Sequence, residues 1–380
     1  MASTTQHSPP LSVALRGEWP LLLSFITTAL FAFNGKAWLS DLSNPLWFGF
    51  MSLWLFGVIM ASAFAIVRHA ESLAVILGEP LGTLVLTLAV IGIEVMMISA
   101  VMLTGKGDPA IARDTMFAVV MLILNGLVGL ALLLGGWKHR EQTYNVYGAN
   151  AFLALIVPLA TLGMVLPNFT RSSPGPTFSP FQAVFLSLMS LGIYGVFLAT
   201  QTGRHSSYFV APDSDEAGHA HGHGDMAVQS TPYHAILLIA FMAPLVVLAK
   251  QLAVPIEYGV KAFGAPPALS GLIVAVIILS PEAMSAIRAA LDNQLQRSVN
   301  ILLGSVLATI GLTIPAVLSI GLFTKKTVVL GLSSIEMILL LLTLGVSTLT
   351  FSGNRTNILL GAIHLLLFFA YLMLLFDAPV

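Results

Sequence analysis

The strongest constraint on the fold of this chain is a series of eleven apolar stretches, each about 20 residues long and separated by polar gaps. A helix needs about 20 apolar residues to cross a hydrocarbon core roughly 30 Å thick, and it satisfies its own backbone hydrogen bonds in lipid. The stretches therefore predict an all-α polytopic membrane protein with about eleven transmembrane helices. They fall at approximately 18–37, 45–67, 80–104, 114–136, 148–168, 180–202, 233–252, 267–290, 298–323, 328–350 and 355–376.

Composition indicates that the solvent of this chain is largely lipid. Of its 380 residues, 57% are hydrophobic and only 9% are charged, whereas a soluble domain has about 25% charged residues. The net charge of −1 argues against nucleic-acid binding, which needs a basic surface. The chain has no cysteine, which excludes disulfides, thiolate metal sites and cysteine nucleophiles. The expected partners are the lipid bilayer, inorganic cations and protons, and a homo-oligomer is left open.

Two polar segments differ from the short gaps. Residues 1–17 form a polar tail before the first apolar stretch, which lacks a clear cleavage site and is kept as a helix. Residues 204–232 are acidic, rich in histidine and poor in large apolar groups, so a flexible loop is expected, with six predicted helices before it and five after. Lys and Arg are almost evenly divided between the two sides of the membrane. A weak preference of Arg predicts that the N-terminus and this loop are cytoplasmic.

Two stretches of the sequence, residues 78–100 and 264–286, share a pattern. Each begins with a Gly-x-Pro turn, continues as an apolar helix and has one glutamate near its middle. An arginine near the start of the next helix and a polar residue twelve positions further on complete the pattern. The paired positions are Glu94 and Glu282, Arg113 and Arg297, and Asn125 and Thr309.

The two copies of this pattern lie five predicted helices apart, so they cross the membrane in opposite directions. This arrangement is typical of inverted-topology transporters, whose binding site lies near mid-membrane where the repeats meet. The sequence predicts a first helix outside the repeats, a first five-helix repeat at 45–203 and a second at 233–377. The charged residues predicted at gating or interfacial positions are Glu79, Arg113 and Arg297.

Glu94 and Glu282 are the acidic residues that lie deepest within apolar stretches. Because burying a charge at mid-bilayer costs several kcal/mol, such a residue indicates function. Two carboxylates that face each other in a low-dielectric site repel and lose hydration, so both should hold protons near neutral pH unless a cation displaces them. Competition between protons and a cation for one site, with alternating access, is antiport. The alternative for either glutamate is a protonated side chain in a helix–helix hydrogen bond.

Further oxygen ligands would have to come from neighbouring groups, because calcium takes about six to eight and two carboxylates supply at most about four. Pro281, which precedes Glu282, frees a backbone carbonyl. Hydroxyl and amide side chains on nearby helices could also contribute, although such residues commonly serve only to join membrane helices. The candidate supporting ligands are Asn125, Ser305, Thr309, Ser280 and Thr87.

These motifs resemble the cation/calcium exchanger superfamily. VRHAESLAVILGEPLG (67–82), LSPEAMSAIRAALDNQLQRSVN (279–300), LLGSVLAT (302–309) and FSGNRTNILLGAIHLLLFFAYL (351–372) are most similar to its bacterial proton-coupled, ChaA-type branch. The resemblance implies one helix plus two five-helix halves in the bacterial inner membrane. It implies exchange of Ca²⁺, Na⁺ or K⁺ for H⁺ without a cofactor, with Glu94 and Glu282 as the binding carboxylates. The acidic loop would be cytoplasmic and regulatory.

Two positions depart from that family pattern. Many calcium/proton exchangers of the superfamily place Asn three residues before each glutamate, where this chain has Ile91 and Leu279. Fewer oxygen ligands favour a site that also accepts Na⁺ or K⁺. The sequence therefore predicts a proton-coupled antiporter of Ca²⁺, with Na⁺ or K⁺ as further substrates. The alternative is a Na⁺(K⁺)/H⁺ antiporter with little calcium activity.

The histidines of the acidic loop are candidates for metal binding or pH sensing. His219, His221 and His223 alternate with small residues, which suits transition-metal binding or pH sensing, and a solvated linker is the alternative. An intramembrane metalloenzyme needs a helical ligand cluster such as HExxH, which the sequence lacks, so no enzyme is predicted. A cation channel usually has a pore loop or rings of charge from several subunits, so the paired glutamates favour a transporter.

Overall fold

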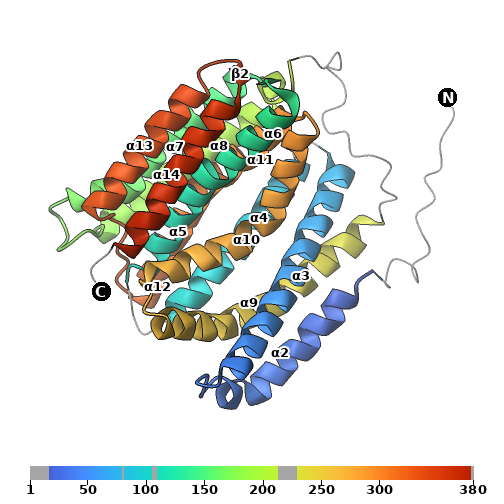
Figure 1. Ribbon diagram of the computed structural model, residues 1–380, viewed down its shortest axis with the longest axis vertical. Helices are drawn as coiled ribbons and strands as arrows, with labels where there is room; N and C mark the ends of the chain where they lie inside the picture. The colour runs from blue at the N-terminus through green and yellow to red at the C-terminus, as the bar shows by residue number, and fades with distance from the viewer. Residues whose placement is uncertain (1–16, 79–80, 105–108, 213–228, 378–380) are drawn as a thin grey trace. The chain divides into compact units, whose positions relative to one another are not determined.

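The protein is almost entirely helical in the computed structural model, which describes residues 17–78, 81–104, 109–212 and 229–377 (Figure 1). In the first half of the chain the helices are α2 (Trp19–Trp38), α3 (Pro45–Leu77), α4 (Leu81–Thr104), α5 (Ile111–Met121), α6 (Val128–His139), α7 (Val146–Ala160) and α8 (Pro180–Thr202). In the second half they are α9 (Thr231–Ala262), α10 (Ala268–Leu291), α11 (Leu295–Ala308), α12 (Ile314–Thr324), α13 (Ser334–Thr350) and α14 (Ile358–Phe376).

Short elements join or follow some of these helices. The π-helical turns η1 (Leu122–Leu127) and η5 (Thr309–Thr313) make α5–α6 and α11–α12 two continuous helices. α7 continues into the π-helical turn η2 (Thr161–Val165) and the 3-10 turn η3 (Leu166–Asn168), and a second 3-10 turn, η4 (Ser206–Phe209), follows α8. Strands β1 (Gln142–Thr143) and β2 (Arg355–Thr356) pair in antiparallel fashion, with Gln142 opposite Thr356.

The eleven predicted membrane helices are confirmed in number and order. Among the described residues, nine helices are long and apolar enough to cross a membrane, and two shorter apolar stretches lie in α4 and α13. Some ends differ from the predictions. α3 continues to Leu77 because good helix formers follow its apolar stretch, and α9 continues to Ala262 with Pro255 inside it. α13 begins late, at Ser334, because Ser333 and Glu336 form a capping box there.

Large apolar side chains are exposed on the outer faces of several helices. Along α8, Phe181, Phe185 and Leu188 are all exposed, and Phe33 of α2 is 87% exposed. Water would penalise such surfaces, whereas lipid does not. The exposure therefore agrees with a chain whose helices face a bilayer.

One compact unit of the fold consists of α2, α3, α4 as far as Ala100 and α9 as far as Tyr258. α2 lies beside α3 (Figure 1), where the ring of Phe31 meets that of Trp54 edge-on at 5.4 Å. Trp54 Nε1 also donates a hydrogen bond to Thr27 Oγ1. α9 reaches α2 through Gln251, whose amide lies against Gly35. These contacts use small and polar groups to join the helices, as is common in membranes.

The other compact unit contains α5 to α8 and α10 to α14. α10 packs against α5 and α11, α8 against α12, and α14 against α6. The last contact is close, because a Cβ atom added at Gly361 would lie 2.5 Å from the backbone nitrogen of Leu133. The C-terminal end of α5 lies in the core of this unit, where Ala118, Val119, Val120 and Met121 are fully buried.

The C-terminal end of α10 is held by groups at the end of α6 and just after it. Gln142 Nε2 donates to the carbonyl oxygen of Ala290, and Lys138 Nζ donates to that of Leu291, both at 2.8 Å. The last carbonyl groups of a helix have no partner within it, and cations nearby also complement the helix dipole. These bonds therefore fix the end of the helix that carries Glu282.

Candidate cation site

Glu282 lies on α10 and is partly buried. Ser305 Oγ of α11 donates a hydrogen bond of 2.8 Å to Glu282 Oε2. A hydroxyl group can donate to a carboxylate and accept from a protonated carboxyl group, so this contact suits both forms of Glu282. Pro281 lacks an N–H group, which leaves the carbonyl of Ile277 without its usual helical partner.

Asn125 lies in the π-helical turn η1, which packs against both α10 and α11. The side chain is fully buried. Its Nδ2 donates a hydrogen bond of 2.8 Å to Thr343 Oγ1 of α13, and its Oδ1 has no hydrogen-bond partner among the described residues. Because leaving a buried acceptor unpaired costs free energy, an oxygen in this state is a candidate cation ligand.

Thr309 and Ser280 occupy different surroundings. Thr309 is the first residue of the π-helical turn η5 and is 1% exposed. The two polar residues paired by the sequence pattern, Asn125 and Thr309, therefore both lie in π-helical turns. Such turns often mark functional sites, because they change the backbone hydrogen bonding of a helix. Ser280 Oγ donates to the carbonyl of Val276 in its own helix, a bond that serves the helix itself.

Glu94 lies on α4 and is 3% exposed. Ile91 and Ile98, on the same face of α4, are buried with it. Gly92 lies against α9, because a Cβ atom added there would approach Met242 Cε to 2.8 Å. The surroundings that the sequence predicts for Glu94, an apolar helix interior, are those that the structure shows.

The two arginines of the sequence pattern lie in unlike places. Arg113 forms an ion pair with its neighbour Asp114 at 2.7 Å. It also donates to the carbonyl oxygen of Gly331, which connects the start of α5 to the segment before α13. Arg297 is exposed near the start of α11. Each lies in the first turn of its helix.

The predicted residues are divided between the two compact units. Asn125, Glu282, Ser305 and Thr309 belong to one unit, and Glu94 belongs to the other. Within the unit that contains Glu282, Ser305 is in direct contact with that residue. The predictions for Glu79, His219, His221 and His223 lie outside the described residues, and Thr87 lies outside the described side chains.

A polar face on α13 was missed by sequence reasoning. Thr343 and Ser347 are fully buried, and Thr350 is 3% exposed. Thr343 Oγ1 accepts the bond from Asn125, and Thr350 Oγ1 lies 3.0 Å from His364 Nε2 on α14. The spacing of four and then three residues, which places all three hydroxyl groups on one face of a helix, could have identified this face.

The oxygen groups that this compact unit offers as candidate cation ligands lie on α10, α11 and η1. They are the Glu282 carboxylate with the Ser305 hydroxyl bonded to it, the unpaired Asn125 amide oxygen and the freed carbonyl of Ile277. Such hard oxygen ligands suit alkali and alkaline-earth cations rather than transition metals.

Comparison with known proteins identifies the family of this chain. The pattern of the family described as sodium/calcium exchanger protein matches residues 47–203 and 233–376. The sodium-potassium/proton antiporter ChaA of Escherichia coli (strain K12) is 41% identical over 340 residues, which cover 89% of this chain and 92% of that protein. The protein y4hA of Sinorhizobium fredii is 42% identical over 324 residues, which cover 84% of this chain and 86% of that protein.

The fold is also that of a solved structure. The native structure of YfkE, a Ca²⁺/H⁺ antiporter, superposes with a TM-score of 0.69 at 19% sequence identity, and the match covers 94% of this chain and 99% of that one. The family pattern spans most of the chain and the identity to ChaA extends over nearly all of it. The chain therefore belongs to the sodium/calcium exchanger protein family.

Proposed function

We propose that this protein is a proton-coupled cation antiporter that exchanges Ca²⁺, and also Na⁺ or K⁺, for H⁺ by alternating access. The observation that carries the proposal is the burial of Glu94, 3% exposed within an apolar membrane helix. A buried carboxyl group is costly in a membrane, and it is retained where ions or protons bind. Glu282 occupies the corresponding position in the second copy of the sequence pattern.

In the proposed mechanism, Glu94 and Glu282 bind either protons or the transported cation. A divalent cation neutralises two carboxylates at once, so its departure leaves two sites for protons. Exchange of one Ca²⁺ for two H⁺ moves no net charge, and a third proton would move one charge, worth about 2.3 kcal/mol per 100 mV. The scheme uses the ions themselves and needs no resident cofactor.

Contacts of the described residues support some of the candidate ligands. Ser305 is placed to stay bonded to Glu282 in both its charged and its protonated form. Asn125 would present its unpaired Oδ1 to the cation, with Thr309 lining the path from η5. Ser280 and Thr87 stay candidates from the sequence alone. Arg113 and Arg297 would act at the membrane interface.

A second candidate function is Na⁺(K⁺)/H⁺ antiport with little calcium activity. The name of the E. coli relative, a sodium-potassium/proton antiporter at 41% identity, favours it. The buried apolar side chains of Ile91 and Leu279 also favour it, because an Asn at either position would add an oxygen ligand that calcium needs.

The proposed location is the bacterial inner membrane, with the N-terminus and the loop 204–232 in the cytoplasm. The weak arginine preference of one side supports this orientation. In that orientation the exchanger can move cations out of the cytoplasm with protons moving inward down their gradient.

The proposal is tested by proton flux in inside-out vesicles with an acidic lumen. A pH-sensitive dye reports the lumenal pH while Ca²⁺, Na⁺ or K⁺ is added. Dissipation of the gradient by one or more of these cations is expected in the parent protein. It should be lost in Glu94→Gln and in Glu282→Gln, because an amide can neither release a proton nor neutralise a cation.

The matched control is Glu141→Gln, since Glu141 is an exposed residue paired with Arg355. This variant should retain the full cation-dependent flux. Absence of cation-dependent proton flux in the parent, or full flux in both membrane variants, would contradict the proposal. A current that does not saturate with cation concentration and is uncoupled from protons would instead indicate a channel.

A further inference from the structure

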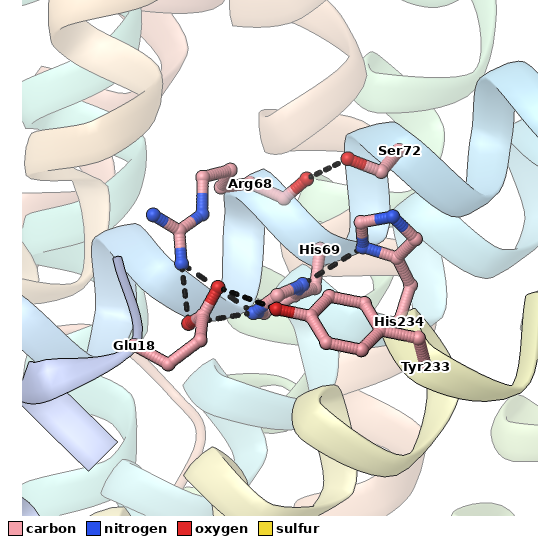
Figure 2. A network of polar contacts seen from close by, with 6 residues as sticks. All are labelled: Glu18, Arg68, His69, Ser72, Tyr233 and His234. Atoms are coloured by element: carbon pink, nitrogen blue, oxygen red, sulfur yellow. Dashed lines mark hydrogen bonds and ion pairs between the residues drawn. The ribbon is translucent and has the colours of Figure 1, made fainter. Parts of the chain in front are cut away.

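A polar cluster joins the beginnings of α2 and α9 to α3 within one compact unit (Figure 2). At its centre are His69 of α3 and His234 of α9, whose Nδ1 atoms lie 2.9 Å apart. The two side chains are 1% and 7% exposed. Phe241 of α9 lies against the His69 ring, with 5.8 Å between the ring centres. Two imidazole rings are thus in direct contact in a place largely closed to water.

Glu18, the residue before α2, provides the negative charge of this cluster. Its Oε2 lies 2.6 Å from Arg68 Nη2 and 3.2 Å from His69 Nε2, and Tyr233 donates to its Oε1 at 3.3 Å. Burial alone would raise the pKa of Glu18, but the hydrogen bond with His69 and the charge of Arg68 more than offset this, so its pKa lies below the ordinary value. Glu18 is therefore a carboxylate at neutral pH.

The hydrogen positions in the cluster follow from these contacts. His69 Nε2 lies 3.2 Å from Glu18 Oε2 and 3.5 Å from Arg68 Nη2. Because a carboxylate only accepts hydrogen bonds, the shorter contact places a proton on His69 Nε2 toward Glu18. Between the two Nδ1 atoms there is room for one proton, since one nitrogen must donate and the other accept. With His234 as the donor, both rings are neutral. With His69 as the donor, His69 is an imidazolium that bonds Glu18 and His234 at once, and His234 carries its own proton on Nε2.

The cluster can therefore take up one extra proton without losing a hydrogen bond, and it cannot easily take up a second. Two charged rings would place two N–H groups face to face across 2.9 Å. The charged and titratable groups that contact the rings, among the described residues, are Glu18 from before α2, Arg68 from α3 and Tyr233 from α9. The described residues contain no group of three or more metal-type ligands, and the direct bond between the rings indicates a proton as the ligand.

We propose that His69 and His234 form a second proton-binding site, in addition to the membrane glutamates, and that its occupancy sets the pH range in which exchange is active. This inference rests on the proposed proton-coupled function. With one proton bound, His69 and Glu18 form an ion pair that holds the start of α2 against α3. Without that proton the same contact is a hydrogen bond from a neutral ring to the Glu18 carboxylate, which is weaker than the ion pair.

Packing offers a route from this pair toward Glu94. Phe241 contacts His69, and the next residue, Met242, packs against Gly92 of α4, two positions before Glu94. A change in how α9 is held at His234 therefore acts on the helix that carries Glu94. With the N-terminus in the cytoplasm, the pair would respond to cytoplasmic pH.

The first test is the pH profile of cation-dependent proton flux in vesicles that expose the N-terminal side to the buffer. The parent profile should contain a step at the pH where the pair gains or loses its shared proton. His69→Gln keeps a donor for Glu18 but cannot titrate, and it should remove that step. Glu18→Gln removes the charge that favours the imidazolium, and it should move the step toward acid by about 1 pH unit.

Two control variants distinguish a proton-binding role of the cluster from a purely structural role. His234→Asn keeps a hydrogen-bonding atom opposite His69 Nδ1, so the step should remain in this variant. His205→Asn changes an exposed histidine outside the cluster, and its profile should match that of the parent. Profiles that keep the same step in His69→Gln and Glu18→Gln, with only the rate reduced, would overturn the proposal and leave the cluster a structural connection.

A second measurement does not depend on transport. Nitrogen-15 labelling of the histidines in the full-length protein reports the protons on each ring by nuclear magnetic resonance, with His69→Gln and His234→Asn identifying the signals. One ring of the pair is expected to change from charged to neutral as the pH rises. If neither ring titrates, or both become charged together, the proposal is wrong even where the antiport itself is confirmed.

Discussion

At the scale of single residues, the orientation of the Asn125 amide depends on Thr343. The Thr343 hydroxyl accepts from Asn125 Nδ2 at 2.8 Å, and Met121 Sδ is a weaker acceptor at 3.7 Å. This bond leaves Oδ1 as the free end of the amide. Removing the hydroxyl in Thr343→Val would leave a buried N–H group unpaired, at a cost of about 1–3 kcal/mol. We expect the apparent KM for the transported cation to rise about tenfold, because the amide is no longer held with its oxygen toward the ion.

Conservative and distant variants distinguish positioning from packing. Thr343→Ser keeps the hydroxyl group and should restore the KM of the parent. Thr348→Val changes an exposed threonine of the same helix that bonds only to the Leu344 carbonyl, and it should have no effect on KM. Uptake assays at several cation concentrations give these values. An unchanged KM in Thr343→Val, with a lower melting temperature, would show that Thr343 serves only stability.

The sequence could identify Asn125 but not its partner. Asn125 follows from the register of the repeated pattern, and the burial of Glu94 follows from the apolar residues on both sides of it. Thr343 lies 218 positions away from Asn125 and resembles any other hydroxyl group in a membrane helix. The pair His69 and His234 is likewise 165 positions apart. Contacts of this kind depend on how the helices pack, so no local sequence pattern predicts them.

At the scale of elements, the contact between α6 and α14 depends on two glycines. A Cβ atom at Gly361 would lie 2.5 Å from the backbone nitrogen of Leu133 and 2.8 Å from the carbonyl oxygen of Gly129. Because backbone atoms cannot move aside cheaply, Gly361→Ala should separate the helices and lower the melting temperature of the purified protein. Overpacking of this kind costs about 1–3 kcal/mol.

A matched glycine tests this expectation. Gly345 lies in α13, another membrane helix, and a Cβ atom there would meet nothing within 4 Å. Gly345→Ala should leave the melting temperature unchanged or raise it slightly, since alanine restricts the unfolded chain. Equal melting temperatures in the two variants would show that the α6–α14 contact tolerates a methyl group.

Helix existence was predictable here because each apolar stretch must cross the bilayer, whatever else it contacts. The residues at which the helices end were harder to predict. VRHAESLAVIL carries α3 on to Leu77, since the residues after the apolar stretch are themselves good helix formers. The π-helical turns η1 and η5 could not be predicted either, because LILNGL and TIGLT have no composition that sets them apart from α-helix. Only the backbone hydrogen bonding of the structure shows that Asn125 and Thr309 lie in such turns.

At the scale of the whole molecule, the order of helices fixes which ends share a side of the membrane. Six membrane helices separate the N-terminus from the segment after α8, and five more lead to the C-terminus. An even number of crossings returns the chain to the same side, and an odd number does not. The segment that follows α8 should therefore share the cytoplasmic side with the N-terminus, while the C-terminus should lie on the opposite side.

The absence of cysteine from this chain makes that arrangement directly measurable. Ser206 and Asp377 are exposed residues after α8 and α14, so Ser206→Cys and Asp377→Cys each introduce a single reactive thiol. A membrane-impermeant maleimide applied to intact spheroplasts should label Asp377→Cys at once and Ser206→Cys only after permeabilisation, and the parent chain supplies the unlabelled background. Labelling of both variants in intact spheroplasts would contradict the odd number of crossings between them. Labelling of Ser206→Cys alone would keep that number but reverse the orientation, and the His69–His234 pair would then respond to the pH outside the cytoplasm.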